Sequence, residues 1–134
     1  MKTYTNTLLR HSFIDRFYYL DLHGKVGEET FAHARYLNQE FYKSDEWLWT
    51  RDQVILRDDG CDLAHPDYPI AGRIYIHHID PITVEDILNR TPKLLDLDNL
   101  ICTSFNTHQA IHYGDINLLI TEPIQRTRGD TTLW

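Results

Sequence analysis

Four of the chain's eight histidines fall in two pairs whose spacing suits metal chemistry. His77 and His78 are neighbours, whereas His108 and His112 are four residues apart. Residues four apart on a helix lie on the same face, so two imidazoles at this spacing can bind one ion. The alternative is a pair of solvent-facing histidines on a polar helix. The second pair, about thirty residues upstream, favours the metal interpretation because imidazole is both a good ligand and a good proton acceptor.

The neighbouring pair ends a short apolar run, Ile74-Tyr75-Ile76, that predicts a β-strand. Successive side chains on a strand point to opposite faces, so His77 and His78 cannot both face one ion while the strand continues. We therefore expect one imidazole to bind metal and the other to reach a water molecule beside a scissile phosphate. For His78, a hydrogen-bonded turn residue is the structural alternative. Strand end and helix would then face each other across a divalent ion, a site suited to phosphodiester cleavage.

Asn99 is the third candidate position, at the predicted junction between a loop and a short apolar segment that runs to Cys102. Asparagine is common in turns, where its side chain bonds nearby backbone. A functional interpretation gives the same amide the task of holding a loop or the base imidazole in place. The two interpretations overlap, and the sequence leaves both open.

Capping residues predict the helices that support these side chains. The first helix has Ser44 as its N-cap and runs to about Arg57. The second covers residues 84–89, with Thr83 and Asp86 at capping-box spacing. The third begins at Thr103 or Ser104 and is ended by Gly114. The last of these carries His108 and His112. Two candidate strands precede it, Cys61 to Leu63 and Arg73 to His77.

The two ends of the chain show weaker patterns. Residues 1–25 have no clean period and contain an aromatic cluster, which predicts an arm packed over the core with at most one short helix. Glu28 to Tyr36 has helical spacing, and Asn38 to Lys43 is predicted to be a connector. The last twenty residues predict an extended tail. A length of 134 residues fits a single domain.

Composition limits the functional classes. The chain has 42% hydrophobic residues and 25% charged ones, as expected of a folded soluble protein. No apolar run approaches the roughly 18 residues of a membrane span, and the N-terminal segment lacks an apolar signal region, so we expect a cytoplasmic location and no membrane partner. Cys61 and Cys102 cannot form a cysteine-based zinc knuckle. A net charge of −7 argues against DNA binding through a broad basic face, but not against a small nuclease site.

The segment Ile76-His77-His78-Ile79, followed by Asn99-Leu100 and by His108 and His112, resembles the HNH endonucleases of the ββα-metal fold. In colicin-type members, a His-His pair, an asparagine and two histidines four apart occur in this order. The resemblance covers residues 61–115. It implies an α+β fold with a small ββα-metal core over 44–115, a helical or irregular N-terminal arm over 1–43 and an extended tail over 116–134.

The resemblance also implies roles, residue by residue. His77, His108 and His112 stand where the family binds its metal. His78 stands in the general-base position, and Asn99 in the position that orients the base and braces the loop. Many members have an Asp among the ligands, and this chain has only imidazoles. Carboxylates suit Mg²⁺, whereas three imidazoles suit Zn²⁺, Ni²⁺ or Mn²⁺ better, so one divalent ion is expected and its identity stays open.

A second likeness concerns partners. The stretches Val54 to Leu63 and Ala110 to Asp115 are similar to small HNH proteins of tailed bacteriophages. That likeness implies DNA as substrate and terminase or portal proteins of the packaging machinery as partners, in the host cytoplasm. The candidate phosphate contacts are Arg57, Arg73, Arg126 and Arg128, which are otherwise ordinary surface charges.

Two other functions remain open. One is a non-catalytic, metal-stabilised module of a packaging complex, which the acidic surface favours. The other is a metal-dependent hydrolase of small molecules, which fits the ligands and leaves the strand–loop–helix spacing unexplained.

Overall fold

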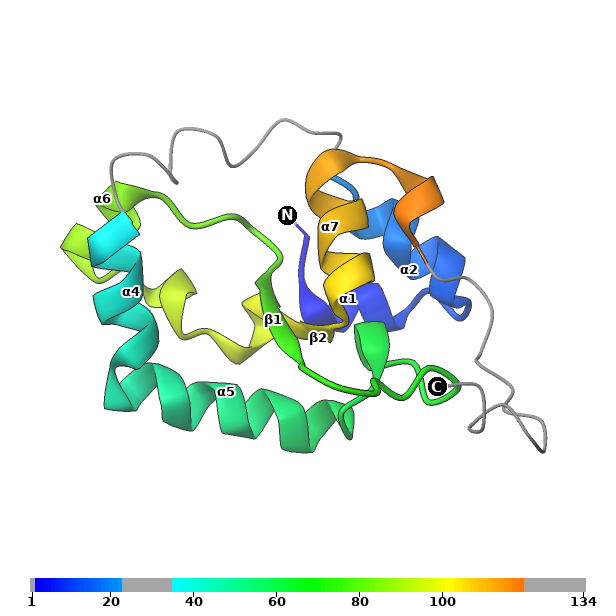
Figure 1. The fold of residues 1–134 in the computed structure, drawn as a ribbon, viewed down its shortest axis with the longest axis horizontal. Helices are drawn as coiled ribbons and strands as arrows, with labels where there is room; N and C mark the ends of the chain where they lie inside the picture. The colour runs from blue at the N-terminus through cyan, green and yellow to red at the C-terminus, as the bar shows by residue number, and fades with distance from the viewer. Residues whose placement is uncertain (1, 23–34, 120–134) are drawn as a thin grey trace, which may run out of the picture.

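The computed structural model describes residues 2–22 and 35–119, which form a mostly helical α+β domain around one two-stranded antiparallel sheet (Figure 1). The α+β prediction is confirmed. The helices and strands are α1 (Tyr4–Leu8), α2 (Phe13–Leu20), α4 (Arg35–Lys43), α5 (Asp45–Asp58), β1 (Tyr75–His78), α6 (Val84–Asn89), β2 (Leu100–Thr103) and α7 (Phe105–Tyr113). Short 3-10 helices span Asp62–Ala64, Pro92–Leu94, Leu97–Asn99 and Ile116–Leu118.

The sheet lies between α5 on one face and α7 on the other (Figure 1). β1 and β2 pair with Tyr75 opposite Thr103 and His78 opposite Leu100. Because side chains alternate along a strand, the two faces belong to separate apolar clusters. Ile76 packs toward Trp47 and its neighbours on the α5 side. Ile101 is buried in the other cluster, which α7 shares.

The predicted caps of α5 and α6 are confirmed, and of the two N-cap candidates for α7, Thr103 and Ser104, the structure has Ser104. The hydroxyl of Ser44 accepts the backbone N–H of Trp47 at the start of α5. Thr83 and Asp86 form both hydrogen bonds of a capping box before α6. Ser104 caps α7, and Gly114, at φ 64°, ends it in the left-handed conformation that glycine adopts most easily. These caps place α7 directly after β2, with no loop between strand and helix.

The strand predicted over Cys61 to Leu63 is wrong. This segment turns into the 3-10 helix Asp62–Ala64, and only an isolated bridge pairs Cys61 with Pro69. The physical reason is the buried carboxylate of Asp62, whose oxygens accept the backbone N–H of Ser104 and the hydroxyl of Thr107. These long-range bonds turn the segment toward α7. The second predicted strand, Arg73 to His77, is observed two residues later at its start and one later at its end.

The connector predicted over Asn38 to Lys43 is also wrong, because those residues belong to α4. Of the helix predicted over Glu28 to Tyr36, only the last two residues fall within the description, in α4, and the rest lies outside it. The tail beyond residue 119 lies outside it as well. The loop predicted over Pro92 to Asp98 contains two 3-10 turns.

The N-terminal segment contributes to the core rather than only covering it. Phe13, Phe17 and Leu20 of α2 are buried in the same cluster as Ile101 and the α7 residue Ile111. Two helices form there, where the sequence predicted at most one. The mutual burial of α2 and α7 therefore helps to set the position of the helix that carries His108 and His112.

Arg57 links the N-terminal segment to the sheet. Its guanidinium donates to the backbone carbonyls of Leu97 and Leu100 and to the carboxylate of Asp58, and it lies 3.4 Å from the centre of the Tyr4 ring. Every one of these contacts is internal. These contacts give Arg57 a structural role, and its assignment as a phosphate contact stays a prediction.

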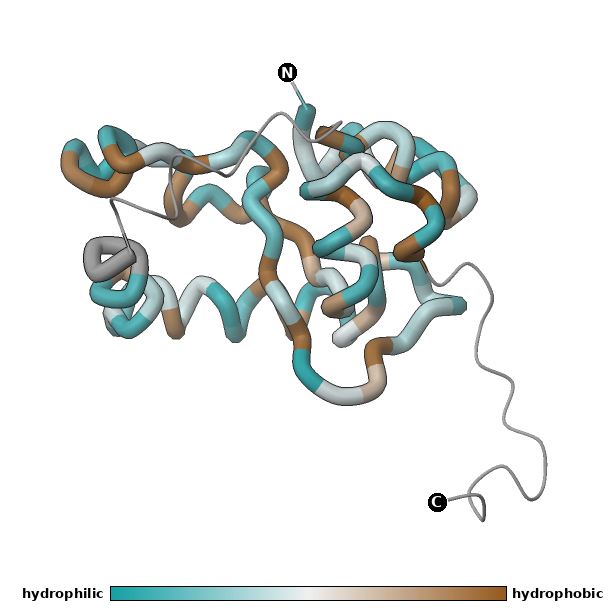
Figure 2. The backbone as a smooth tube through the Cα atoms, turned by 45° about the horizontal axis from the view of Figure 1, so that its top comes forward, coloured by the Kyte–Doolittle hydropathy of each residue, from teal (hydrophilic) through white to brown (hydrophobic). Residues whose placement is uncertain are grey.

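No described helix has the length and apolar content to cross a bilayer. The hydrophobic residues occur in short stretches separated by hydrophilic ones along the whole described chain (Figure 2).

Tyr4 generates a prediction about stability at alkaline pH. Burial, followed by the charge of Asp58 and a hydrogen bond to it, raises the pKa of the Tyr4 hydroxyl to about 12. An unfolded tyrosine titrates near 10, so the folded state holds this proton more tightly, and the resulting stability is present below about pH 10 and lost as the pH rises toward 12. The free energy of unfolding of wild type relative to Tyr4→Phe should therefore shrink between about pH 10 and pH 12 in urea titrations. A difference that stays constant over this range would contradict the assignment.

Candidate metal centre

Three imidazoles converge between β1 and α7. His77 comes from the strand, and His108 and His112 come from the helix; each offers a ring nitrogen, and these nitrogens all lie within 4.8 Å of one another. The Nε2 atoms of His108 and His112 are 3.0 Å apart, a distance at which they can share a proton or face one ion together. The ring of His77 is 5.5 Å from that of His108 and 5.3 Å from that of His112, between ring centres. The structure thus brings together the three residues predicted as ligands.

Local geometry explains the convergence. On β1, Tyr75 and His77 point to the face that α7 covers, because side chains two apart on a strand share a face. On α7, the four-residue spacing places both histidines on the side that faces the strand. Ala110 and Ile111 of the same helix are fully buried in the core, so the helix has no freedom to rotate its histidines away from β1.

One buried nitrogen without a hydrogen-bond partner indicates that the three histidines fit a metal ion. His77 is 2% exposed, and its Nε2 has no hydrogen-bond partner. A buried polar atom without a partner costs about 1–3 kcal/mol, and such atoms in native proteins point to a missing partner. Two nitrogens about 2.0–2.1 Å from one tetrahedral Zn²⁺ lie about 3.3 Å apart. The His108 and His112 nitrogens, 3.0 Å apart, are already close to this distance, and a pair at the 4.8 Å limit would have to approach by about 1.5 Å.

The surroundings keep the three imidazoles neutral, which is the form that binds metal. Burial, then the nearby His108 and His112, lowers the pKa of His77 well below its usual value. Burial, then His112 and His78, lowers the pKa of His108 to about 4. Burial lowers the pKa of His112 as well. No carboxylate joins the cluster among residues 2–22 and 35–119. An all-imidazole set suits Zn²⁺ or Ni²⁺ better than Mg²⁺.

His78 is not part of this cluster. Its side chain points to the opposite face of the sheet, where its ring stacks on that of Trp47 at 5.3 Å between centres and lies 6.4 Å from that of Phe41. Its Nε2 lies 3.0 Å from the carbonyl oxygen of Leu94. Because a carbonyl oxygen can only accept a hydrogen bond, the Nε2 is the donor. Burial lowers the pKa of His78 to about 4, and the ring is neutral at pH 7. The expected position beside the bound phosphate is not observed, because β1 keeps its regular alternation through His78.

Asn99 braces the loop between β1 and β2. Its Oδ1 accepts the backbone N–H of Asp80, and its Nδ2 donates to the carbonyls of Asp80 and Lys93. The residue after Lys93 is Leu94, whose carbonyl holds His78. The bracing half of the prediction matches these bonds. Asn99 makes these bonds to Asp80 and Lys93 rather than to His78 itself, and the part of the prediction that assigns it to orienting the base stays a prediction.

The predicted phosphate contacts are dispersed. Arg57 is engaged within the fold. Arg73 is exposed and lies 5.3 Å from the centre of the Tyr75 ring, close to the metal centre. Arg126 and Arg128 lie outside the described residues.

Asp62 was missed as a positioning residue. Its carboxylate is buried, so its pKa is raised, and it holds both the N-cap residue Ser104 and Thr107 in the first turn of α7. No sequence pattern marks it, because its partners lie more than forty residues away.

Comparison of the chain with protein-family models, with curated proteins and with solved structures found no match. The geometry of the site therefore carries the functional argument alone.

The unpaired nitrogen of His77 predicts a separation between stability and metal binding. His77→Leu should leave the metal-free protein as stable as wild type or more so, because an apolar side chain of similar size removes an unsatisfied buried atom. The same change should weaken binding of Zn²⁺ or Ni²⁺ at least about 100-fold in calorimetry, since one of three ligands is gone. His11→Ala, at an exposed histidine outside the cluster, is the control and should bind as wild type does. Equal affinity in His77→Leu and wild type would exclude the ligand assignment.

The bonds of Asn99 predict a second effect. Asn99→Asp keeps the acceptor for the Asp80 N–H but replaces two donated bonds with a carboxylate oxygen facing two carbonyls. The free energy of unfolding should fall by about 2–4 kcal/mol, measured in urea, because both carbonyls lose their partner. Asn117→Asp, at an exposed asparagine, should change it little. Equal losses in the two variants would mean that the loop is not braced by Asn99.

Proposed function

We propose that this protein is a metal-dependent endonuclease of the HNH type that hydrolyses DNA phosphodiester bonds. The single observation that carries the proposal is the convergence of His77 with His108 and His112 on one ion-sized site. Strand β1, strand β2 and helix α7 follow one another in the order of a ββα-metal motif, which supports the finer fold assignment. In this assignment, the trio would be the ion-binding site of the motif.

The chain's own residues perform three tasks in this proposal. His77, His108 and His112 hold the ion with neutral nitrogens, and three protein ligands leave a position for substrate, as in catalytic rather than structural sites. When bound, the ion supplies Lewis-acid stabilisation of the charge that develops on phosphate oxygens. Asn99 keeps the loop after β1 in one conformation, and Asp62 fixes the first turn of α7.

His78 is the proposed proton acceptor. Since its Nε2 donates to Leu94, its Nδ1 bears the lone pair that would take a proton from the attacking water. A positioned base of this kind contributes about 10²- to 10⁴-fold to the rate. For this step the imidazole must leave the stack on Trp47 or the water must reach it there.

The packing of His78 favours a second candidate, a metal-stabilised module with no catalysis. An imidazole stacked on Trp47, and hydrogen-bonded to Leu94, has the environment of a core residue. In that function the ion would contribute folding stability alone, as structural zinc does in small domains.

A plasmid-nicking assay decides between the two. With Zn²⁺, Ni²⁺, Mn²⁺ or Mg²⁺ added, the wild type should nick supercoiled DNA, and chelation should stop it. His112→Ala should lose both cutting and calorimetric metal affinity. His78→Gln should lose about 10²- to 10⁴-fold in rate and keep its metal affinity, because the side chain lies on the other face of the sheet. His11→Ala is the matched control. If an added ion raises the thermal stability of the protein but none of the four ions supports nicking, the structural module is favoured.

A further inference from the structure

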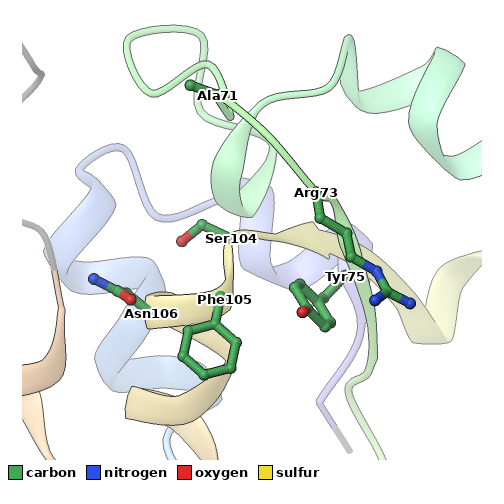
Figure 3. Close-up of a pocket in the computed structure, with 6 residues that line it drawn as sticks. All are labelled: Ala71, Arg73, Tyr75, Ser104, Phe105 and Asn106. Atoms are coloured by element: carbon green, nitrogen blue, oxygen red, sulfur yellow. The ribbon is translucent and has the colours of Figure 1, made fainter. Parts of the chain in front are cut away.

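A hollow of about 230 Å³ lies where the segment before β1 meets the first turn of α7. It is lined by Ala71, Arg73, Tyr75, Ser104, Phe105 and Asn106 (Figure 3). The Tyr75 and Phe105 rings lie next to each other, and the Arg73 guanidinium lies on the far side of Tyr75 from Phe105 (Figure 3). Two aromatic surfaces and one cation thus share a single opening to solvent.

Tyr75 connects this hollow with the metal centre. It lines the hollow, and its ring stacks on that of His108 at 5.9 Å between centres, with 17° between planes. The exposed Phe105 ring lies 5.8 Å from the Tyr75 ring, with 55° between planes. Tyr75 thus contacts both an exposed aromatic ring and one of the three clustered imidazoles. A nucleotide strand held at the metal centre would pass close to these rings.

The fold does not require Phe105 for its core. Its side chain is 53% exposed, whereas Ala110 and Ile111 make the buried contacts of α7. A second hollow, of about 450 Å³, shares Phe105 and Asn106 with the first and is also lined by Gln109, Tyr113, Asn117 and Leu118. Phe105 thus lines two hollows whose linings contain aromatic and amide residues.

The charge of these linings also favours nucleic acid. The chain has 20 acidic residues, yet neither hollow is lined by an Asp or a Glu. A net charge of −7 argues against affinity from a broad basic face, and Arg73 is the one cationic residue in the linings of the two hollows. Base–aromatic stacking does not depend on charge and tolerates any base, because every base has a π-face. Amides can pair with the edge of an unpaired base.

We propose that Phe105 and Tyr75 form a stacking site for an unpaired nucleobase of a strand whose neighbouring phosphate lies at the metal centre. The proposal rests on the proposed function for the identity of the ligand, and it names the form of the substrate: DNA with unpaired bases at the cut. Arg73 contacts one backbone phosphate of the same strand.

Binding without catalysis tests the proposal. A fluorescein-labelled, mixed-sequence single strand of about ten nucleotides is titrated with the full chain in EDTA, and anisotropy gives the Kd. Phe105→Ala should weaken binding about 5- to 100-fold, the range that loss of one stacked base produces. Phe105→Trp should bind as wild type does. The matched control is Trp49→Ala on α5, whose ring is 62% exposed and distant in the chain from both hollows; it should change nothing.

Salt dependence separates the two kinds of contact. Loss of one phosphate contact from a single strand changes the slope of log Kd against log salt concentration by about 0.7. Arg73→Gln should therefore make the slope shallower by this amount, whereas Phe105→Ala should weaken binding at every salt concentration and leave the slope unchanged. A blunt duplex of the same sequence should be insensitive to Phe105→Ala.

The outcomes distinguish this proposal from the nuclease proposal. If wild type nicks DNA and the Phe105→Ala variant has the same single-strand Kd and the same KM as wild type, the stacking site is overturned and the nuclease proposal stands. If wild type never nicks DNA but binds the single strand, and Phe105→Ala loses that binding, the nuclease proposal is overturned and the stacking site is supported. No single-strand binding by wild type, an equal loss in Trp49→Ala, or an equal loss on duplex overturns the stacking site.

Discussion

The alternation of side chains along β1 is the constraint on which the site depends. In four residues the strand sends Tyr75 and His77 toward α7, and Ile76 and His78 toward α5. Within residues 2–22 and 35–119 the sheet has two strands, and one principal helix covers each face. Whether a side chain of β1 lies at an odd or an even position therefore decides which helix it meets. Because adjacent side chains on a strand point to opposite faces, His77 joins the metal-ligand cluster and His78 joins the aromatic core around Trp47.

The other side of the cluster is held by contacts far apart in sequence. Asp62 fixes the N-terminal turn of α7, α2 packs against the same helix, and Asn99 ties the loop after β1 to the start of β2. Each contact is weak alone, but together they prevent α7 from sliding along the strand. A metal site needs such support, since ligands displaced by an ångström no longer share one ion.

Electrostatics divides the molecule into regions of different chemistry. The chain is acidic, yet its imidazole trio sits among uncharged groups that keep it neutral, and the linings of the hollows beside it carry no carboxylate. Repulsion of a polyanion by the rest of the surface would be screened beyond about a Debye length, 8 Å at physiological salt. An acid-poor aromatic surface can therefore act locally on DNA, although the chain as a whole has the charge of a protein that avoids it.

The sequence by itself determined the features whose causes are local. The caps at Ser44, Thr83, Ser104 and Gly114, and the shared helix face of His108 and His112, depend on residues within one or two turns, and they were predicted correctly. The pairing of His77 with that helix rested on a resemblance as well as on spacing. Only the tertiary structure decided the rest: that Cys61 to Leu63 turns rather than extends, that Arg57 donates its hydrogen bonds within the fold, and that His78 stacks on Trp47. Each of these outcomes depends on a partner about thirty or more residues away, which no local pattern encodes.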